Sequence, residues 1–472
     1  MQKEVSVIFE GVNEILNTID SEGEIVTMLG LPSEKCALIG STIKLTKFLG
    51  GGTQGEAFQI EIPGMGEKVY VVKKADLTLQ VLEGTQQKVE NKLQTEGYSW
   101  NDIEGWQPQN FIDQWENANH HDKVKVVIPP KMCLQKGPTF FPIIPLNGIK
   151  KDGGNIVNAM FEVPKGSYIC ENASFSELAI AIYAGKLYRD GICANFFNTY
   201  SMFTCANKEQ YDTDFMEYQQ YTFMDKIDGE INKYGNCITW NKYIEDNKRI
   251  SPDITNGIYI QTLFAIAAYQ HHYKISHNDL HTGNLFVEVV TPKTMFGGKN
   301  VAEYDFYHYQ IADNDIYIPV VPILAKIGDY GLSSKYTKPI IGNYEVFIDG
   351  MNTDDGTGAW IPTVYLPSYD SLYFTGAYAQ LVVKDRKYSN ATELLQECIS
   401  FMCPGIEKYK QEEDIIQNLL INSLYIKKSN GRPILENLIG VKDARDVLLG
   451  PVLKYYSKKP HFSAKILTLG KI

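Results

Sequence analysis

Residues 277–284 read HNDLHTGN, which places the carboxylate of Asp279 five positions before the amide of Asn284. An apolar run that predicts a helix over 256–275 comes directly before them, so both residues lie on the turn that follows this helix. Transfer of a phosphoryl group from ATP needs a carboxylate that orients the attacking hydroxyl and an amide oxygen that holds Mg²⁺ against the phosphates. The spacing of Asp279 and Asn284 supplies both groups.

Two further motifs should accompany such a loop, and both occur in the required order. Upstream, residues 50–55 read Gly-x-Gly-x-x-Gly, and residues 70–73 read Tyr-Val-Val-Lys. Downstream, the triplet Asp-Tyr-Gly at 329–331 follows an apolar run at 323–327. Three short motifs in one order are far less likely to arise by chance than any one of them.

The residues around the glycines predict a β-hairpin. Apolar and polar residues alternate over 57–62 and again over 69–71, and the turn sequence Pro-Gly-Met-Gly separates the two runs. A dinucleotide-binding fingerprint would instead need a helix to begin within the glycines. Glycines before a strand let backbone N–H groups approach phosphates closely. The residues expected to contact the nucleotide are Gly50, Gly51, Gly52, Gly55, Ala57, Val71, Lys73 and Met224.

Lys73 is the candidate for holding the α- and β-phosphates, and Lys74 is its rival. Side chains alternate across a strand, so only one of the two lysines can face the nucleotide. We choose Lys73 because Val71 would then lie on the same face, beside the nucleotide.

Glu177 is the candidate partner for an ion pair with Lys73. It stands near the start of a helix whose apolar spacing resumes at 175. Glu90 and Glu96 compete for this role. Glu177 could alternatively be a solvated carboxylate in the first turn of its helix, where the helix dipole favours negative charge.

The patterns along the chain predict an α+β protein in three parts. Residues 1–48 show helical spacing and predict an N-terminal helical extension. Residues 49–226 are rich in strand patterns, with an insertion at about 76–170, and residues 227–472 are mostly helical and end in a helical extension. The excursion 291–320 is long enough for an inserted hairpin or surface loop.

Composition limits the function classes. The chain has 472 residues, of which 44% are hydrophobic and 21% charged, as in ordinary globular proteins. Its net charge of −11 argues against nucleic acid as the main partner. No window approaches the roughly 18 apolar residues of a membrane span. The eight cysteines form no Cys-x-x-Cys pair, so we expect no zinc site and a reducing, intracellular, cytoplasmic location.

The motifs together resemble the protein-kinase superfamily over about residues 49–400. The matching residues are Gly50, Gly52, Gly55, Lys73, His277, Asp279, Asn284, Asp329, Tyr330 and Gly331. Asp370, in Tyr-Asp-Ser-Leu, resembles the helix aspartate that supports the catalytic-loop backbone in that family. The resemblance implies a two-lobed kinase-like fold with a β-rich N-lobe, a mostly helical C-lobe and large insertions. It also implies ATP and Mg²⁺ as cofactors and a protein serine/threonine kinase as the activity.

The resemblance assigns a role to each motif residue. Asp279 would be the catalytic base, and Asn284 and Asp329 would hold Mg²⁺ through hard oxygen ligands. His281 stands where the family has a phosphate-contacting lysine, so it could donate to the transferred phosphoryl group. It could equally be a loop histidine bonded to a carbonyl. A zinc site formed by His277, Asp279 and His281 is disfavoured because the other motifs need Asp279.

Departures from the family leave the acceptor open. Asn278 replaces the family's arginine, and no Ala-Pro-Glu follows the Asp-Tyr-Gly turn. The pattern His-x-Asp-Leu-His-x-Gly-Asn also occurs in small-molecule kinases such as aminoglycoside and choline phosphotransferases. A third alternative is a pseudokinase interaction module, against which the intact motif residues argue.

The divergent motifs, long insertions and tyrosine-rich acidic composition resemble the virion-associated protein kinases of large DNA viruses, of the poxvirus type. That resemblance implies Ser/Thr or dual-specificity phosphorylation of virion proteins. It further implies a location in the host cytoplasm and in the virion.

Overall fold

The chain is an α+β protein that divides into two compact units, each described separately below. The first unit comprises Met1–Ile180, Tyr200–Met224 and Gly331–Gly350, and the second comprises Ala181–Thr199, Asp225–Tyr330 and Met351–Ile472. The structure is a computed structural model. It describes residues 34–52, 55–62, 69–80, 123–127, 132–136, 139–144, 150–152, 155–157, 160–164, 167–170, 173–206, 215–227, 238–247, 250–337, 340–343, 365–383, 389–402 and 442–472.

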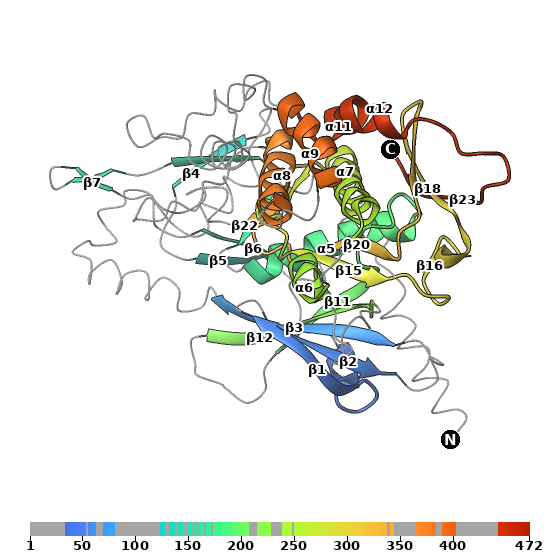
Figure 1. Cartoon of the computed structure of the whole chain (residues 1–472). Coiled ribbons are helices and arrows are strands. Elements are labelled where there is room, and N and C mark those ends of the chain that lie inside the picture. The colour runs from blue at the N-terminus through green and yellow to red at the C-terminus, as the bar shows by residue number, and fades with distance from the viewer. Residues whose placement is uncertain are drawn as a thin grey trace. The chain divides into compact units, whose positions relative to one another are not determined.

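The first unit is built on a five-stranded sheet in the order β1-β2-β3-β12-β11 (Figure 1). Its strands are β1 (Lys44–Gly52), β2 (Gly55–Glu61), β3 (Tyr70–Gln80), β11 (Thr199–Ala206) and β12 (Phe215–Asp225). The strands β1, β2 and β3 pair antiparallel in sequence order, so the predicted hairpin between 57 and 71 is present.

Two predicted boundaries in this region are wrong. The strand β1 already begins at Lys44, which pairs with Glu61, so residues 44–48 are not part of a helical extension. The remainder of that extension up to 33 lies outside the described residues. The strand β3 continues to Gln80, so the insertion cannot begin at 76. In both cases pairing with a neighbouring strand extends the element beyond its local sequence pattern.

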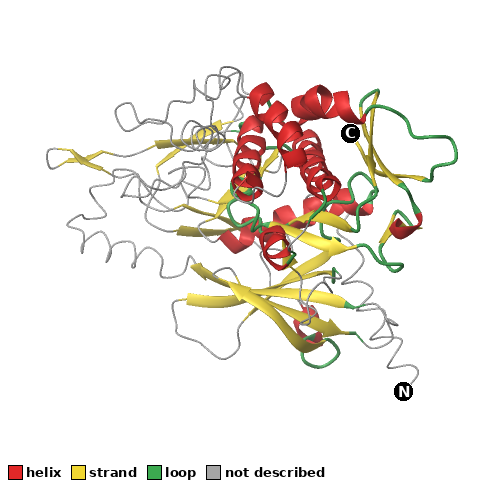
Figure 2. Ribbon diagram, viewed as in Figure 1, coloured by secondary structure: helices red, strands yellow, loops and turns green. Residues whose placement is uncertain are grey.

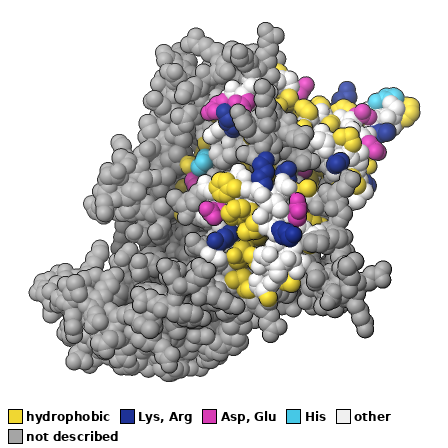
Figure 3. Space-filling view, turned by 90° about the horizontal axis from the view of Figure 1, so that it is seen from below, with side chains coloured by type: hydrophobic (Ala, Val, Ile, Leu, Met, Phe, Trp, Pro, Cys, Tyr) yellow, Lys and Arg dark blue, Asp and Glu magenta, His cyan; other side chains and the backbone are white. Residues whose placement is uncertain are grey.

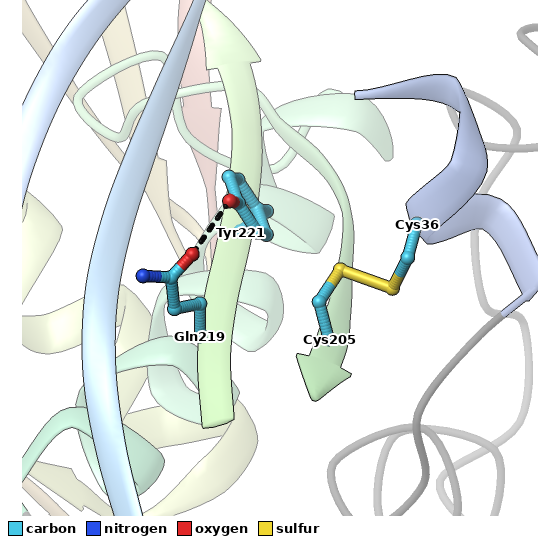
Figure 4. Close-up of a disulfide and its surroundings, with 4 residues drawn as sticks. All are labelled: Cys36, Cys205, Gln219 and Tyr221. Carbon is cyan, nitrogen blue, oxygen red and sulfur yellow. Dashed lines mark hydrogen bonds between the residues drawn. A yellow bond between two sulfur atoms is a disulfide. The ribbon is translucent and has the colours of Figure 1, made fainter. Parts of the chain in front are cut away.

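One face of this sheet carries the hydrophobic core of the first unit. Its buried members come from two stretches of the chain, 43–72 and 205–223. They are Ile43, Ile60, Ile62, Tyr70, Val72, Cys205, Tyr221 and Phe223. A disulfide joins Cys205 to Cys36, on the 3₁₀ helix η1 (Glu34–Leu38), and so fastens this helix to the core (Figure 4). The sequence did not predict this pairing, because a contact between distant residues is not visible in cysteine spacing.

Further short strands belong to the first unit. They are β4 (Lys123–Val127), β5 (Met132–Lys136), β6 (Thr139–Ile144), β7 (Lys150–Asp152), β8 (Asn155–Val157), β9 (Met160–Pro164), β10 (Ser167–Cys170), β21 (Ser334–Lys335) and β22 (Ile340–Asn343). The strand β22 pairs parallel with β10 and antiparallel with β21. The rest of the predicted insertion lies outside the described residues.

Helices dominate the second unit (Figure 2). They are α6 (Trp240–Asp246), α7 (Pro252–Tyr273), α8 (Pro367–Val383), α9 (Ser389–Met402), α11 (Ala444–Val447), the π-helical segment η7 (Leu448–Val452) and α12 (Leu453–Tyr456). The helix α5 (Ala173–Arg189) begins in the first unit and ends in the second.

The helix α7 forms the centre of the second unit. Every residue from Gly257 to Gln270 is buried, as expected for a helix that is apolar on all sides. Ser251 caps its N-terminus, and Lys274 ends it in a left-handed conformation. The helices α8 and α9 pack against α7 and against each other (Figure 1).

A three-stranded sheet, β13-β15-β20, lies in the second unit and is bonded to α7. Its strands are β13 (Ile238–Thr239), β15 (Leu285–Val289) and β20 (Ile323–Ile327). Gln261 Oε1 on α7 accepts from the backbone N–H of Ala325, 2.8 Å away, and from Asn195 Nδ2 at 3.0 Å. These bonds pair the buried amide oxygen of Gln261 with two donors and fix β20 on the helix.

The excursion after β15 contains the predicted hairpin, formed by β18 (Phe306–Ile311) and β19 (Asn314–Pro319). The small pair β16 (Met295–Phe296) and β17 (Lys299–Asn300) precedes it. The C-terminal strand β23 (Ile466–Lys471) pairs parallel with β18, so the predicted helical C-terminal extension contains a strand as well as the helices α11 and α12. Leu467 and Leu469, two positions apart, are both buried, as expected for one face of a strand. The segment forms a strand because it pairs with β18 at the edge of the hairpin.

The surface of the described residues is mixed in character. On the face drawn in Figure 3, hydrophobic side chains form a band with basic and acidic side chains around it. The exposed large hydrophobic residues are Leu45, Phe48, Met295, Tyr455 and Phe462. None of the helices in the described ranges combines the length and apolar character that a bilayer crossing requires, in agreement with the predicted absence of a membrane span.

Candidate functional site

The loop that carries Asp279 follows α7 and the short strand β14 (Ile275–Ser276). Asp370 of α8 binds its backbone through hydrogen bonds. The backbone N–H groups of His277 and Asn278 donate to the two carboxylate oxygens of Asp370 at 2.8 and 2.9 Å. Tyr269 donates its hydroxyl to the same carboxylate at 2.8 Å. Asp370 is fully buried, and Asn278 has a left-handed backbone with φ 66°. These bonds hold a backbone conformation that a non-glycine residue rarely adopts.

Burial raises the pKa of the Asp370 carboxyl, and the neighbouring His277 and the hydrogen-bond donors act in the opposite direction. The carboxylate accepts three hydrogen bonds, from one hydroxyl and two backbone N–H groups, and these bonds compensate its buried charge.

The Asp279 carboxylate lies among three polar side chains of the second unit. Asn284 donates its Nδ2 to the backbone carbonyl of Asp279 at 2.9 Å and to Oδ2 at 3.3 Å. Tyr373 donates its hydroxyl to Oδ1 at 3.4 Å, and His281 Nε2 lies 3.8 Å from Oδ2. Because Asn284 uses its nitrogen toward Asp279, its amide oxygen is the atom available to a hard cation.

His281 is oriented by the backbone of its own loop. Its Nδ1 accepts a hydrogen bond from the N–H of Gly283 at 2.9 Å, so the neutral ring carries its hydrogen on Nε2. A Cβ at position 283 would lie 2.7 Å from the ring carbon Cε1, so a side chain there would displace the His281 ring. The hydrogen-bond partner of the His281 ring is thus an N–H group, whereas the alternative prediction for this residue was a bond to a carbonyl.

The register of β15 against β20 brings Asp329 near this loop. Leu285 pairs with Ile327, so Asn284 and Gly328 meet at the same end of the two strands, and the N–H of Gly328 donates to the carbonyl of Asn284 at 3.2 Å. Asp329 follows with φ 61°, a left-handed backbone. The loop and the Asp-Tyr-Gly turn are therefore joined through the backbone.

His277 and Tyr330 pack the two segments together. His277 Nε2 lies 3.0 Å from the carbonyl oxygen of Gly328, and the rings of His277 and Tyr330 are 5.2 Å apart. Tyr330 is buried and donates to the carbonyl of Ile327 at 3.1 Å. This contact uses Nε2 of the His277 ring. Within the described ranges, no group of three or more His, Cys, Asp or Glu side chains is arranged to hold a metal ion.

The first unit contains the other predicted site residues. Lys73 lies on β3 opposite Ala57 and forms an ion pair with Glu177 of α5. Val72 belongs to the core, and side chains alternate along a strand. Lys74 therefore lies on the same face of β3 as Val72, and Lys73 lies on the opposite face. Glu177 is 4% exposed and lies beyond the first turn of α5, so it is not a solvated first-turn carboxylate. Its rivals at 90 and 96 lie outside the described residues.

The glycines form the turn end of the β1–β2 hairpin, where Gly52 pairs with Gly55. Gly55 has φ 130°, and a Cβ there would lie 2.3 Å from the carbonyl oxygen of Lys74, so only glycine fits. Val71 is buried on β3, and Met224 is half-buried on β12. The predicted residues thus fall into two groups: Gly50, Gly51, Gly52, Gly55, Ala57, Val71, Lys73, Glu177 and Met224 in the first unit, and Asp279, His281, Asn284 and Asp329 in the second.

Sequence reasoning missed Tyr373 and the glycines that surround the second group. A Cβ at Gly328 would lie 2.8 Å from the ring of Phe197 and 2.9 Å from the ring of Phe286, so a side chain there would displace these rings. The spacing of Tyr373, three residues after Asp370 on one helix, was a usable signal because such residues share a face.

No protein-family model matches the chain, and no curated protein matches it. Its function is therefore argued from its own residues and their geometry.

Proposed function

We propose that the protein is an ATP- and Mg²⁺-dependent protein kinase with a two-lobed kinase-like fold, which transfers the γ-phosphate to Ser or Thr of protein substrates. The observation that carries the proposal is the ion pair between Lys73 and Glu177, 104 positions apart, on the strand that follows a glycine hairpin and on the helix α5. A surface lysine gains little from such a pair. Here the carboxylate is buried, so it holds the ammonium group in one place.

The second unit supplies the groups for the reaction itself. In the proposed step the hydroxyl oxygen of the acceptor attacks the γ-phosphorus, the bond to the β–γ bridging oxygen breaks, and Asp279 takes the hydroxyl proton. Lys73 neutralises the α- and β-phosphates, and His281 offers its Nε2–H to a phosphoryl oxygen. Asn284 and Asp329 would hold Mg²⁺, which supplies charge neutralisation on the phosphates when bound. Placement and electrostatics account for most of the rate in such a reaction.

A small-molecule kinase is the second candidate. The observation that favours it is His281, which stands where protein kinases have lysine and is kept in one orientation by Gly283. A pseudokinase is disfavoured, because a binding module has no need of a buried carboxylate on Lys73 or of donors around Asp279.

Substrate and location belong to the same proposal. By the resemblance to virion-associated kinases, the acceptors would be virion proteins, and the protein would act in the host cytoplasm and the virion. The disulfide between Cys36 and Cys205 is of a kind that is rare in a reducing cytoplasm. Mass spectrometry of alkylated protein taken from cells would test the proposed location through the redox state of this pair.

One experiment separates the candidates. The protein is incubated with γ-labelled ATP and Mg²⁺, in parallel with casein or histone and with a panel of aminoglycosides and choline. Label on protein supports the protein kinase, and label on a metabolite supports the small-molecule kinase. No transfer to any acceptor would refute both. The Asp279→Asn variant, tested in every arm, controls for a contaminating kinase.

A further inference from the structure

Tyr373 contacts the carboxylate that the proposed function makes the base, and no sequence motif assigns it a role. Its hydroxyl donates to Asp279 Oδ1 at 3.4 Å. The opposite oxygen, Oδ2, faces Asn284 Nδ2 at 3.3 Å and His281 Nε2 at 3.8 Å. Tyr373 therefore binds Oδ1, whereas the loop side chains Asn284 and His281 lie at Oδ2.

Tyr373 and Asp370 act on the loop from one helix. They are three positions apart on α8, so they project from the same face. Asp370 fixes the loop backbone at His277 and Asn278. Tyr373 reaches one step further, to the side chain of Asp279.

The Tyr373 ring is itself held in place. It stacks on Tyr369 with ring centroids 6.1 Å apart and planes 13° apart. Burial raises the pKa of Tyr373, and the charge of Asp279 raises it further, so the phenol stays protonated at neutral pH and acts as a donor. A fixed ring with a protonated hydroxyl can restrict the rotation of a carboxylate.

We propose that Tyr373 is a positioning residue for Asp279: its hydroxyl bond to Oδ1 sets the carboxylate plane for the acceptor hydroxyl. The inference rests on the proposed phosphotransfer function. A carboxylate oxygen has two lone-pair sites, so Oδ1 can bind Tyr373 and still accept from a substrate hydroxyl. The contact adds no charge at the reacting centre, so it acts on turnover rather than on nucleotide binding.

The test compares two hydroxyl deletions on the same helix. Tyr373→Phe removes the bond to Asp279 and keeps the ring that stacks on Tyr369. Tyr378→Phe is the matched control, because Tyr378 donates to the carbonyl of Thr255 and does not touch Asp279. Each variant is assayed for kcat, for the KM of ATP and for its thermal midpoint, with the acceptor that the wild type labels.

We expect Tyr373→Phe to lower kcat about fivefold, as for the loss of one hydrogen bond, with the KM of ATP and the thermal midpoint unchanged. Tyr378→Phe should lower the thermal midpoint and leave kcat unchanged. In an Asp279→Asn background, Tyr373→Phe should have no further effect on turnover, since the group it positions is gone.

Wild-type kcat in Tyr373→Phe would overturn the inference while leaving the proposed function standing. A parallel fall of kcat and thermal midpoint in both tyrosine variants would overturn it too, because that pattern reports general destabilisation. A wild-type protein that transfers no label would instead refute the proposed function, and the inference would fall with it.

Discussion

Replacing Asp370 with alanine should loosen the loop of Asp279 and destabilise the second unit. The carboxylate is fully buried and accepts from two backbone N–H groups and one tyrosine hydroxyl at 2.8 to 2.9 Å. Its removal leaves the N–H groups of His277 and Asn278 buried without their acceptor, at a cost of about 1–3 kcal/mol each. It also releases the left-handed backbone of Asn278.

For the two N–H groups together these losses amount to about 2–6 kcal/mol. That is a large part of the roughly 5–15 kcal/mol by which a folded protein is stable. Asp370→Asn keeps one acceptor oxygen but turns an NH₂ group toward a donor, so we expect a smaller loss than for alanine.

Urea unfolding of the wild type and both variants measures these differences. Amide hydrogen exchange at His277 and Asn278 should accelerate in Asp370→Ala under conditions where the remaining protein stays folded. If Asp370→Ala stayed within about 0.5 kcal/mol of the wild type, as a surface substitution would, and both amides stayed protected, Asp370 would not hold this loop.

The same carboxyl makes stability depend on pH. Burial raises its folded pKa above the ordinary value of 3.8, so the folded protein binds this proton more tightly than the unfolded chain does. The part of the free energy of unfolding that comes from this proton is therefore fully present below pH 3.8 and is lost as the pH rises through the folded pKa, whereas the hydrogen bonds that the carboxylate accepts remain. Asp370→Asn cannot titrate and should lack this part of the slope. An identical slope in both proteins would contradict the assignment.

The remaining predictions concern turnover, nucleotide binding, loop geometry and the disulfide. Asp279→Asn should lower kcat by about 10²–10⁴-fold and leave ATP affinity nearly unchanged; wild-type phosphotransfer would disprove its role as the base. Asp329→Ala should weaken binding of ATP in Mg²⁺, measured by calorimetry, and unchanged affinity would count against a metal-binding role. Gly283→Ala should displace the His281 ring and lower kcat while the KM of ATP is kept, and full activity would show that the ring position is unimportant. Cys36→Ser should lower the free energy of unfolding by up to about 5 kcal/mol, the loop-entropy figure for a sequence separation of 169. Added reductant should destabilise the wild type and leave the stability of the variant unchanged. A wild type whose stability does not respond to reductant would argue against the disulfide.

Local patterns along the chain were enough to predict the elements that surround the candidate site. The alternation that follows the glycines predicted the hairpin of β2 and β3, and the apolar run before His277 predicted α7. The order of strands and helices and the α+β class followed from the same periodicities. These features depend on neighbours a few residues apart, so one sequence determines them.

Contacts between distant residues required the tertiary structure. The partner of Lys73 was one of three glutamates until the fold brought Glu177 to it, and the contact of Tyr373 with Asp279 likewise joins residues far apart along the chain. The bond between Cys36 and Cys205 and the pairing of β23 with β18 were equally invisible along the chain. Periodicity reports which face of an element is buried, whereas the choice of partner on that face depends on how the whole chain packs.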